Sequence, residues 1–466
     1  MFRRLPLLLL LVAPMSYGQG VMQPLSIQGL ERQELMTARA RGMGSAVTAL
    51  TGSIESAILN PAGLASLSRP AFSTSGAWFR QDWAETQHWN PNRYYAGMSL
   101  YFADPEDYRS EPLSEPDWTY NQSSFRLATM AGAVPLEVGD QTLTLGIVFH
   151  QIAQLSDYDR NDNVLDPYIG QFRPDPIERP KPGEEIPVQW SAFERERTGH
   201  LQAVSSSVGF ELHESFHVGL RVSRIWGSST DRQHTRNVGL FLLREDAHDY
   251  SYETATGSLA WDGSSEYSGW RGVFGMQWQY DMITVGVTYQ FASNLRQKFT
   301  NMGREQTQES GARNHTQVGE HQVEIPARIG TGVVLRPIPS IVLAADYFWQ
   351  NFSDLKVLGS AMGSGPDWGM VQGIGLGAEW NLHGATFLRA GFRRDPQPFR
   401  IEGFGLVGQT ATGDAFSIGL GTGISILTLD FAYEFQNLHY QDRWESNVDY
   451  NRVRKHSVLV GVTYAL

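Results

Sequence analysis

Apolar and polar residues alternate along much of the chain, which is the pattern of β-strands with one apolar face. In residues 427–436, leucine, phenylalanine and tyrosine fill every second position, and the positions between them are polar or small. Successive side chains of a strand point to opposite faces, so this period of two predicts a strand. The same alternation recurs in residues 143–150, 216–223, 283–291 and 458–466.

The polar faces of these strands favour a membrane barrel over a soluble β-sandwich. A dry sandwich core accepts charged side chains only when they are fully paired, whereas a transmembrane barrel has a polar lumen and an apolar outer face. The charged residues predicted to face the lumen are Arg221, Arg389, Arg393, Asp430 and Glu434. The predicted fold class is therefore all-β, a transmembrane antiparallel β-barrel.

The connections between the predicted strands alternate between short and long, as in outer-membrane barrels. About fourteen strands are expected, and they begin near residues 71, 122, 141, 198, 216, 266, 283, 321, 341, 370, 385, 413, 426 and 454. Short turns are predicted at 135–141, 213–215, 281–282, 336–340, 381–384 and near Ser425. Long outer loops are predicted between them, among them 155–197, 233–265 and 441–453. Residues 94–102 could form one more strand, but an even number is the rule, so they are assigned to the first outer loop.

The N-terminus predicts export from the cytoplasm. Two arginines precede a short apolar run, and Ser16 and Gly18 follow it as a small-residue cleavage site, as in a secretory signal peptide. The predicted division is a signal peptide at 1–18, a lumenal hatch or plug at 19–70 and the outer-membrane barrel at 71–466. The predicted location is the bacterial outer membrane.

Composition narrows the function classes further. The chain has no cysteine, so an exported protein of this kind depends on its own hydrogen-bonded framework. Its formal net charge of −12 argues against a nucleic-acid partner. Asp157, Asp159 and Asn161 resemble the start of a calcium loop, but the required glycine and glutamate are missing, so no metal site is predicted.

Residues 38–67 contain small-residue segments that resemble a known family. ARARGMGSAVTAL followed by SAILNPAGLASL is similar to the N-terminal hatch of the FadL-type outer-membrane transporters of long-chain fatty acids and other hydrophobic compounds. The Asn-Pro-Ala signature of that family matches Asn60, Pro61 and Ala62, with Gly63 after it and Gly42 and Gly44 before it. The resemblance implies a fourteen-strand barrel, a hatch that gates the lumen, and a ligand that leaves sideways beside a kinked strand.

One apolar cluster stands out within a predicted outer loop. Leu240, Phe241, Leu242 and Leu243 interrupt an otherwise polar stretch. An exposed apolar cluster of this kind often marks a binding surface, so these residues are candidates for ligand capture. The alternative is that they pack under their own loop.

The sequence therefore predicts passive transport of a hydrophobic small molecule by a barrel that is not an enzyme, needs no cofactor, and sits as a monomer among outer-membrane lipid and lipopolysaccharide. The lumenal charges could bind a ligand carboxylate or pair with the hatch, which brings Arg39, Arg41 and Glu55 into the same space. The alternative function is a shuttle that hands cargo proteins to the surface in type IX-like secretion. A lipid hydrolase is a third class, but no nucleophile stands out.

Overall fold

The computed structural model describes residues 37–89, 115–166, 185–244, 249–307, 311–358, 368–400, 410–443 and 447–466. The predicted signal peptide, the first part of the predicted hatch and residues 94–102 lie outside these ranges. The short helices are α1 (Ala38–Gly42), η1 (Ile54–Ala57), η2 (Pro61–Ser66) and η3 (Phe352–Asp354). No helix in the described part of the chain is long and apolar enough to cross a membrane.

Seventeen strand segments make up one antiparallel sheet. The first nine are β1 (Ala71–Trp89), β2 (Trp118–Val138), β3 (Gln141–Asp166), β4 (Glu185–His213), β5 (Phe216–Arg244), β6 (Asp249–Tyr280), β7 (Ile283–Gln290), β8 (Ser293–Thr307) and β9 (Gly311–Ile325). The others are β10 (Arg328–Ile338), β11 (Ile341–Asn351), β12 (Lys356–Leu358), β13 (Met370–His383), β14 (Thr386–Arg400), β15 (Thr410–Ile424), β16 (Leu427–Arg443) and β17 (Asn447–Ala465).

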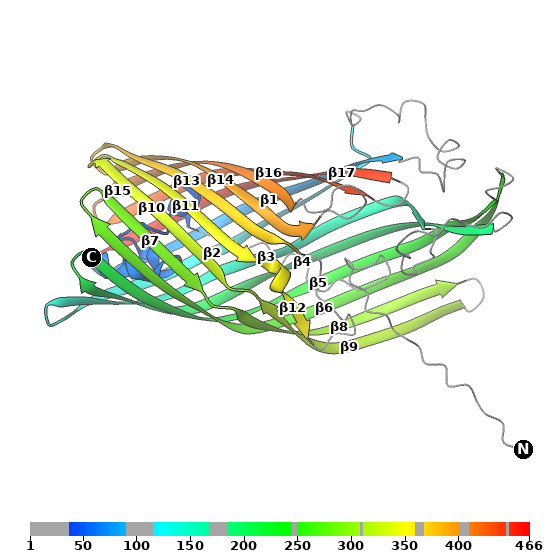
Figure 1. The fold of residues 1–466 in the computed structure, drawn as a ribbon, viewed down its shortest axis with the longest axis horizontal. Helices are drawn as coiled ribbons and strands as arrows, with labels where there is room; N and C mark the ends of the chain where they lie inside the picture. Colours follow the sequence, from blue (N-terminus) through cyan, green and yellow to red (C-terminus); the bar gives the residue numbers. More distant parts are fainter. Residues whose placement is uncertain are drawn as a thin grey trace, which may run out of the picture.

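These segments form fourteen barrel strands, because three neighbouring strands are each interrupted once. β7 and β8 both pair with β6 and form one strand. In the same way β9 and β10 form one strand with a break at Pro326, and β11 and β12 form one strand with η3 between them. β1 pairs with both β2 and β17, so the sheet closes on itself (Figure 1). The predicted fold class and strand number are confirmed.

The short turns gather at one end of the barrel, together with the C-terminus (Figure 1). We call this the short-turn end and the opposite one the long-strand end. The turns join β2 to β3, β4 to β5, β6 to β7, β10 to β11, β13 to β14 and β15 to β16, at the places predicted from the sequence. Several of them need a left-handed backbone, with φ of 51° at Asp281 and 60° at Ser425.

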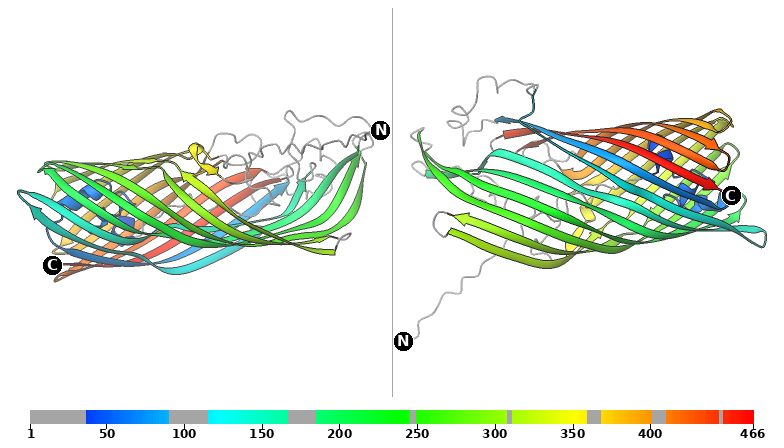
Figure 2. Two further views of the ribbon diagram at one scale, coloured as in Figure 1. Left: turned by 90° about the horizontal axis from the view of Figure 1, so that it is seen from below. Right: turned by 180° about the vertical axis from the view of Figure 1, so that it is seen from behind.

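Several predicted outer loops are strand instead. The stretch 233–265 was expected to be an irregular loop, but β5 runs on to Arg244 and β6 begins at Asp249. The expected loops at 155–197 and 441–453 are also partly strand. In these extensions the strict alternation of apolar and polar residues is lost, while the backbone ladder continues. Figure 2 shows the extensions of β5, β6, β8 and β9 projecting beyond the rest of the wall.

The outward face of the wall is apolar, as the alternation predicts. Phe125 is 74% exposed, Ile147 is 60% exposed and Ile418 is 62% exposed, and each points away from the lumen. Many other large apolar side chains of the wall are exposed in the same way. A wall of this kind suits contact with lipid, because soluble proteins rarely expose extended apolar surface.

Residues 37–67 lie inside the barrel at its short-turn end, where Figures 1 and 2 show them in dark blue. Thr37 caps α1 by accepting a hydrogen bond from the Ala40 amide at 3.2 Å. Pro61 begins η2, a position where the missing N–H of proline costs nothing. Nearly all side chains of this segment are buried against the inner wall. We call residues 37–67 the lumenal segment.

Candidate functional site

The lumenal segment touches the wall through backbone, at positions where the wall has no side chain. A Cβ built on Gly391 would lie 2.0 Å from the Gly44 nitrogen, and one built on Gly219 would lie 2.3 Å from the Pro61 carbonyl carbon. Gly44 itself has a φ of +58°, and Gly42 lies 3.2 Å from such a Cβ on Gly419. The small-residue segment therefore packs directly against glycines of the inner wall.

Asn60 joins the lumenal segment to the wall. Its side-chain oxygen accepts a hydrogen bond from the Ala62 amide at 3.2 Å and so caps η2. Its side-chain nitrogen donates to the Thr48 carbonyl at 2.8 Å and to the Met276 carbonyl of β6 at 3.2 Å. Gly63 is packed so closely that a Cβ there would lie 2.7 Å from the Leu50 carbonyl oxygen. The Asn-Pro-Ala-Gly stretch therefore fixes both the fold of the segment and its place in the barrel.

Four of the five predicted lumenal charges form a paired cluster with the lumenal segment. Arg389 donates to Glu379 and to Asp430, both at 2.6 Å. Arg41 donates to Glu434 at 3.0 Å. Arg39 also binds Glu379, and Arg393 binds Glu434 and Asp395. We call this set, on β13, β14 and β16, the paired cluster.

Arg221, the fifth predicted charge, lies on the opposite side of the lumen and is not part of that cluster. The pairing register runs in one row through Gln350, Arg328, Gln290, Val273 and Arg221, on β11, β10, β7, β6 and β5. Arg271 is two residues from Val273 on the same face of β6, so it is a diagonal neighbour of Arg221. Sequence analysis missed Arg271 and Arg328, although their place on an inner strand face could have been derived from the alternation.

Arg221 and Arg271 have no hydrogen-bond or ion-pair partner among the described residues. Arg221 is 6% exposed and Arg271 is 8% exposed. The Nε and Nη1 atoms of Arg221 and the Nε of Arg271 are buried without an acceptor. Next to them, His150 Nε2 is 3.0 Å from Ser205 Oγ, which is 2.8 Å from Ser223 Oγ.

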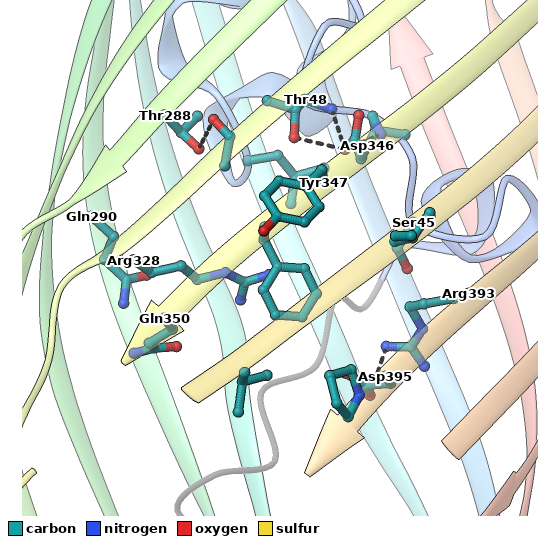
Figure 3. Close-up of a pocket in the computed structure, with 18 of the residues that line it drawn as sticks. Ser45, Thr48, Thr288, Gln290, Arg328, Asp346, Tyr347, Gln350, Arg393 and Asp395 are labelled. Carbon is teal, nitrogen blue, oxygen red and sulfur yellow. Dashed lines mark hydrogen bonds and ion pairs between the residues drawn. The ribbon is translucent and has the colours of Figure 1, made fainter. Parts of the chain in front are cut away.

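These arginines line a lumenal cavity of about 230 Å³. Figure 3 shows Arg328, Gln290 and Gln350 on one side of it and Arg393 with Asp395 on the other. Toward the short-turn end the cavity is closed by the lumenal segment, where Asp346 accepts hydrogen bonds from the Val47 and Thr48 amides at 2.9 Å. The Arg328 guanidinium lies 3.9 Å from the centre of the Phe348 ring.

Toward the long-strand end, the cavity meets an apolar layer. The residues of this layer come from β3, β4, β5, β6, β8, β9, η3 and β13 and from positions next to η3 and β13, and they form one buried cluster. They are Ile152, Ala153, Leu155, Leu201, Ala203, Ile225, Tyr267, Leu295, Val323, Ile325, Phe352, Leu355, Trp368 and Val371. Ile152, Phe352 and Val371 also line the cavity. The cavity therefore has a cationic side and an apolar side.

Beside this cavity, β2 and β3 share only a short stretch of backbone pairing. β2 and β3 pair from Val138–Gln141 only as far as Thr129–His150, although both strands continue well beyond that point. A register shift between Gln151 and Ala153 marks the bend in β3. A glycine is not the cause of the bend, because the bend lies at this bulge and not at Gly146 of the same strand.

Beyond the bend, β3 contacts β1, β2 and β17 through side chains and has no backbone pairing with β2. Ser156 donates to Gln81 of β1 at 3.4 Å, and Asn161 donates to Asp449 of β17 at 3.0 Å. The Tyr158 ring stacks on the Tyr120 ring of β2, with 3.9 Å between the centres. Side chains therefore replace the backbone ladder between β2 and β3 in this part of the wall.

The predicted capture cluster lies in β5, not in a loop. Phe241 is 2% exposed and packs between Trp190 of β4 and Tyr252 of β6, at 6.1 and 4.8 Å between ring centres. Leu240 and Leu242 are half-buried, and Leu243 pairs with Ile186 and Tyr250 in the ladders. The cluster belongs to the strand extensions at the long-strand end.

The residues that resembled a calcium loop are engaged otherwise. Asp159 forms an ion pair with Arg195 at 2.8 Å, and Asn161 binds Asp449. Within the described ranges, no group of three or more histidine, aspartate and glutamate side chains could hold a metal ion.

Comparison with known proteins identifies the fold. No protein-family model matches the chain, and no curated protein matches it either. The solved structure of a Pseudomonas aeruginosa FadL homologue superposes with a TM-score of 0.62 at 13% identity, over 93% of this chain and 99% of that one. The Ralstonia pickettii toluene transporter TbuX gives 0.54 at 14% identity, over 93% and 99%. The P. putida toluene transporter TodX gives 0.56 at 13% identity, over 94% and 99%. The chain has the fold of FadL-type outer-membrane channels, as the resemblance implied.

Proposed function

We propose that this protein is a passive outer-membrane channel for hydrophobic small molecules. The observation that carries the proposal is the end of the β2–β3 ladder at Thr129 and His150, where the wall next to the lumenal cavity is closed by side chains and not by backbone. Proteins of the same fold include toluene transporters and a monoaromatic hydrocarbon channel. The short-turn end faces the periplasm in this proposal, as is the rule for such barrels.

The ligand enters at the long-strand end, where the cluster Leu240, Phe241, Leu242 and Leu243 is proposed to capture it. The half-buried Leu240 and Leu242 offer the apolar surface, and the buried Phe241 supports them. Each buried CH₂ group contributes about 0.8 kcal/mol as the ligand leaves water. The ligand then crosses the apolar layer and reaches the cavity. No cofactor and no energy source is required, because the ligand moves down its own gradient.

The lumenal segment acts as the hatch. Gly42, Gly44, Asn60, Pro61, Ala62 and Gly63 hold it against the wall, so the direct route to the periplasm stays closed. A small shift of this segment, together with separation of β2 from the bent part of β3, opens a sideways route into the bilayer. The protein works as a monomer surrounded by outer-membrane lipid and lipopolysaccharide.

A cysteine lock across the short ladder tests the route. The chain has no cysteine, so an introduced pair is the only one present. Tyr120→Cys/Tyr158→Cys, joined by a short bifunctional thiol reagent, should abolish uptake of a hydrophobic ligand, and the same variant without reagent should retain it. Leu136→Cys/Leu143→Cys is the matched control, because those residues already face each other in the β2–β3 ladder. Equal uptake in both locked variants would exclude this route.

The ligand itself is tested by mass spectrometry of protein purified from native outer membranes in mild detergent. A near-stoichiometric fatty acid or hydrocarbon is the expected result. An empty barrel with a stoichiometric cargo protein would contradict the channel and favour a secretion shuttle.

A further inference from the structure

A second hollow lies on the outside of the barrel, where β2 and β3 extend past the beginning of β1. Its volume is about 620 Å³, within the range of about 300–1,000 Å³ that small-molecule sites have. Apart from Tyr464, every residue that lines it is apolar. We call this hollow the outer groove, and the lining residues that matter below are Phe72, Gly132, Val134, Leu136, Ile147 and Tyr464.

The outer groove exists because one side chain is missing from the outward face of the wall. One row of the pairing register crosses β17, β1, β2 and β3 through Tyr464, Phe72, Gly132 and Ile147. Phe72 is 45% exposed and Ile147 is 60% exposed, and both present large side chains to the outside. Between them, the only atom within 4 Å of a Cβ built on Gly132 is a ring carbon of Phe72, at 4.0 Å. The row therefore has open space at Gly132.

The groove continues from Gly132 to the rim of the short-turn end. The ladder between β1 and β2 ends where Ala71 pairs with Ala133, so β2 has no strand partner on that side from Val134 onward within the described ranges. Figure 2 shows the β2–β3 hairpin, in cyan, projecting beyond the C-terminus. Val134 is 47% exposed and Leu136 is 42% exposed on this hairpin, so its outward face is still apolar. A long apolar chain can therefore lie along β2 and end at the rim.

Charged side chains at the rim favour one kind of headgroup. Arg69 is exposed and directly precedes Pro70, which lines the groove. Glu137, Asp140 and Glu214 are exposed at the neighbouring β2–β3 and β4–β5 turns. A lipid phosphate can pair with the arginine, but a lipid with net negative charge is repelled by the three carboxylates. A headgroup that carries a phosphate and an ammonium group satisfies both signs of charge.

We propose that the outer groove binds one phospholipid with a zwitterionic, ammonium-bearing headgroup, of the phosphatidylethanolamine class. One acyl chain lies along β2 with its end at Gly132, the phosphate lies at Arg69, and the ammonium group faces Glu137 and Asp140. The proposed orientation puts the short-turn end in the periplasmic leaflet, which is the phospholipid leaflet of an outer membrane. The site lies outside the lumen, so this inference goes beyond the proposed channel and does not depend on its route.

Native mass spectrometry of the full-length protein tests this site. The protein is placed in nanodiscs that contain equal amounts of phosphatidylethanolamine and phosphatidylglycerol with the same acyl chains. It is then released under increasing collisional activation, which removes loosely held lipid first. We expect one lipid to be retained, with phosphatidylethanolamine favoured about two- to fivefold, which is the range expected for exposed ion pairs.

Two variants separate the groove from the charges at its rim. Gly132→Leu puts a side chain into the open space and should lose the retained lipid. Ala390→Leu is the matched control, because Ala390 is a small exposed residue of β14 that lies outside the groove. Glu137→Gln/Asp140→Asn leaves the groove unchanged, so it should retain one lipid and lose the preference for phosphatidylethanolamine.

Each other outcome overturns a stated part of the proposal. Equal retention by the wild type and Gly132→Leu would mean that the lipid is ordinary boundary lipid, and the site would be wrong. Equal retention of both headgroups by the wild type would overturn the zwitterionic headgroup. A dimer without lipid, lost in Gly132→Leu, would assign the groove to a second copy of the chain. The channel itself is tested separately, by the uptake measurement with the locked variants.

Discussion

Two groups of arginines face each other across the same lumen and differ in their partners. On β14, Arg389 lies between Glu379 and Asp430, and both of its contacts are 2.6 Å long. On β5 and β6, Arg221 and Arg271 are as deeply buried and have no acceptor among the described residues. The residue type and the burial are the same in both groups, so the two groups differ in the side chains that surround them.

The difference changes what the removal of each arginine is expected to cost in stability. A buried ion pair is strongly destabilised when one partner is removed, because the other charge is left behind. A buried charge without a partner is already unfavourable, and its removal relieves that cost. The paired cluster therefore holds the lumenal segment through Arg39 and Arg41, whereas Arg221 and Arg271 make no such contact among the described residues.

The largest effect is expected from Arg389→Gln. This change leaves Glu379 and Asp430 without their shared partner, and we expect a loss of about 3–5 kcal/mol of unfolding free energy. The shift is measured by denaturant titration of the purified barrel, followed by tryptophan fluorescence. Arg394→Gln, on the same strand, removes only an exposed pair with Asp414. An equal loss of unfolding free energy in that variant would show that a buried pair in the lumen stabilises the fold no more than an exposed pair does.

A smaller loss is expected from Gly391→Ala, which affects the contact between the wall and the lumenal segment near the paired cluster. The new Cβ would lie 2.0 Å from the Gly44 nitrogen, so backbone must move, at about 1–3 kcal/mol. Thermal unfolding measures the change. Gly132→Ala is the control, because the nearest atom there is 4.0 Å away, in Phe72. If both variants melt alike, close backbone contact is not what fixes the segment.

Asn60→Ala should have an intermediate to small effect. It removes the cap of η2 and the two hydrogen bonds to carbonyl oxygens, at about 1–2 kcal/mol. Asn60→Asp keeps the capping oxygen and loses the donors, so it should fall between Ala and wild type. Limited proteolysis from the periplasmic side, as well as melting, reports whether the segment has loosened; unchanged cleavage would mean that Asn60 does not retain it.

The smallest effect on stability, and the one of opposite sign, is expected from Arg221→Gln. The change removes a buried charge that has no partner, so the melting temperature should stay the same or rise slightly. Measured beside Arg389→Gln in the same assay, it tests the comparison directly. A clear loss of stability would show that Arg221 is paired in the folded protein in solution.

The sequence predicted the barrel well because the lipid enforces the alternation. In residues 427–436 every second side chain must be apolar, and this is what the outward face of β16 shows. The same rule fails in 233–265, since no lipid selects the residues of strands that extend past the apolar wall. There the backbone ladder continues between β5 and β6 without that alternation.

The lumenal site was harder to predict for a different reason. That Arg221 faces the lumen follows from its position in one strand. Whether it has a partner depends on the register of several strands and on the path of the lumenal segment, which bring Arg389 to Glu379 but leave Arg221 beside Arg271. The bend of β3 was equally hidden, because it comes from a one-residue bulge and not from a glycine or proline.

The bend of β3 has a consequence for how the chain avoids aggregation. A closed barrel has no edge strands, and an edge strand is a template on which another chain can add. Where β2 and β3 part, each regains an unpaired edge inside an otherwise closed wall. The contacts of Ser156, Tyr158 and Asn161 with β1, β2 and β17 cover the edge of β3 with the protein's own side chains. The barrel therefore lacks its backbone ladder at one place without offering that strand to a neighbouring molecule.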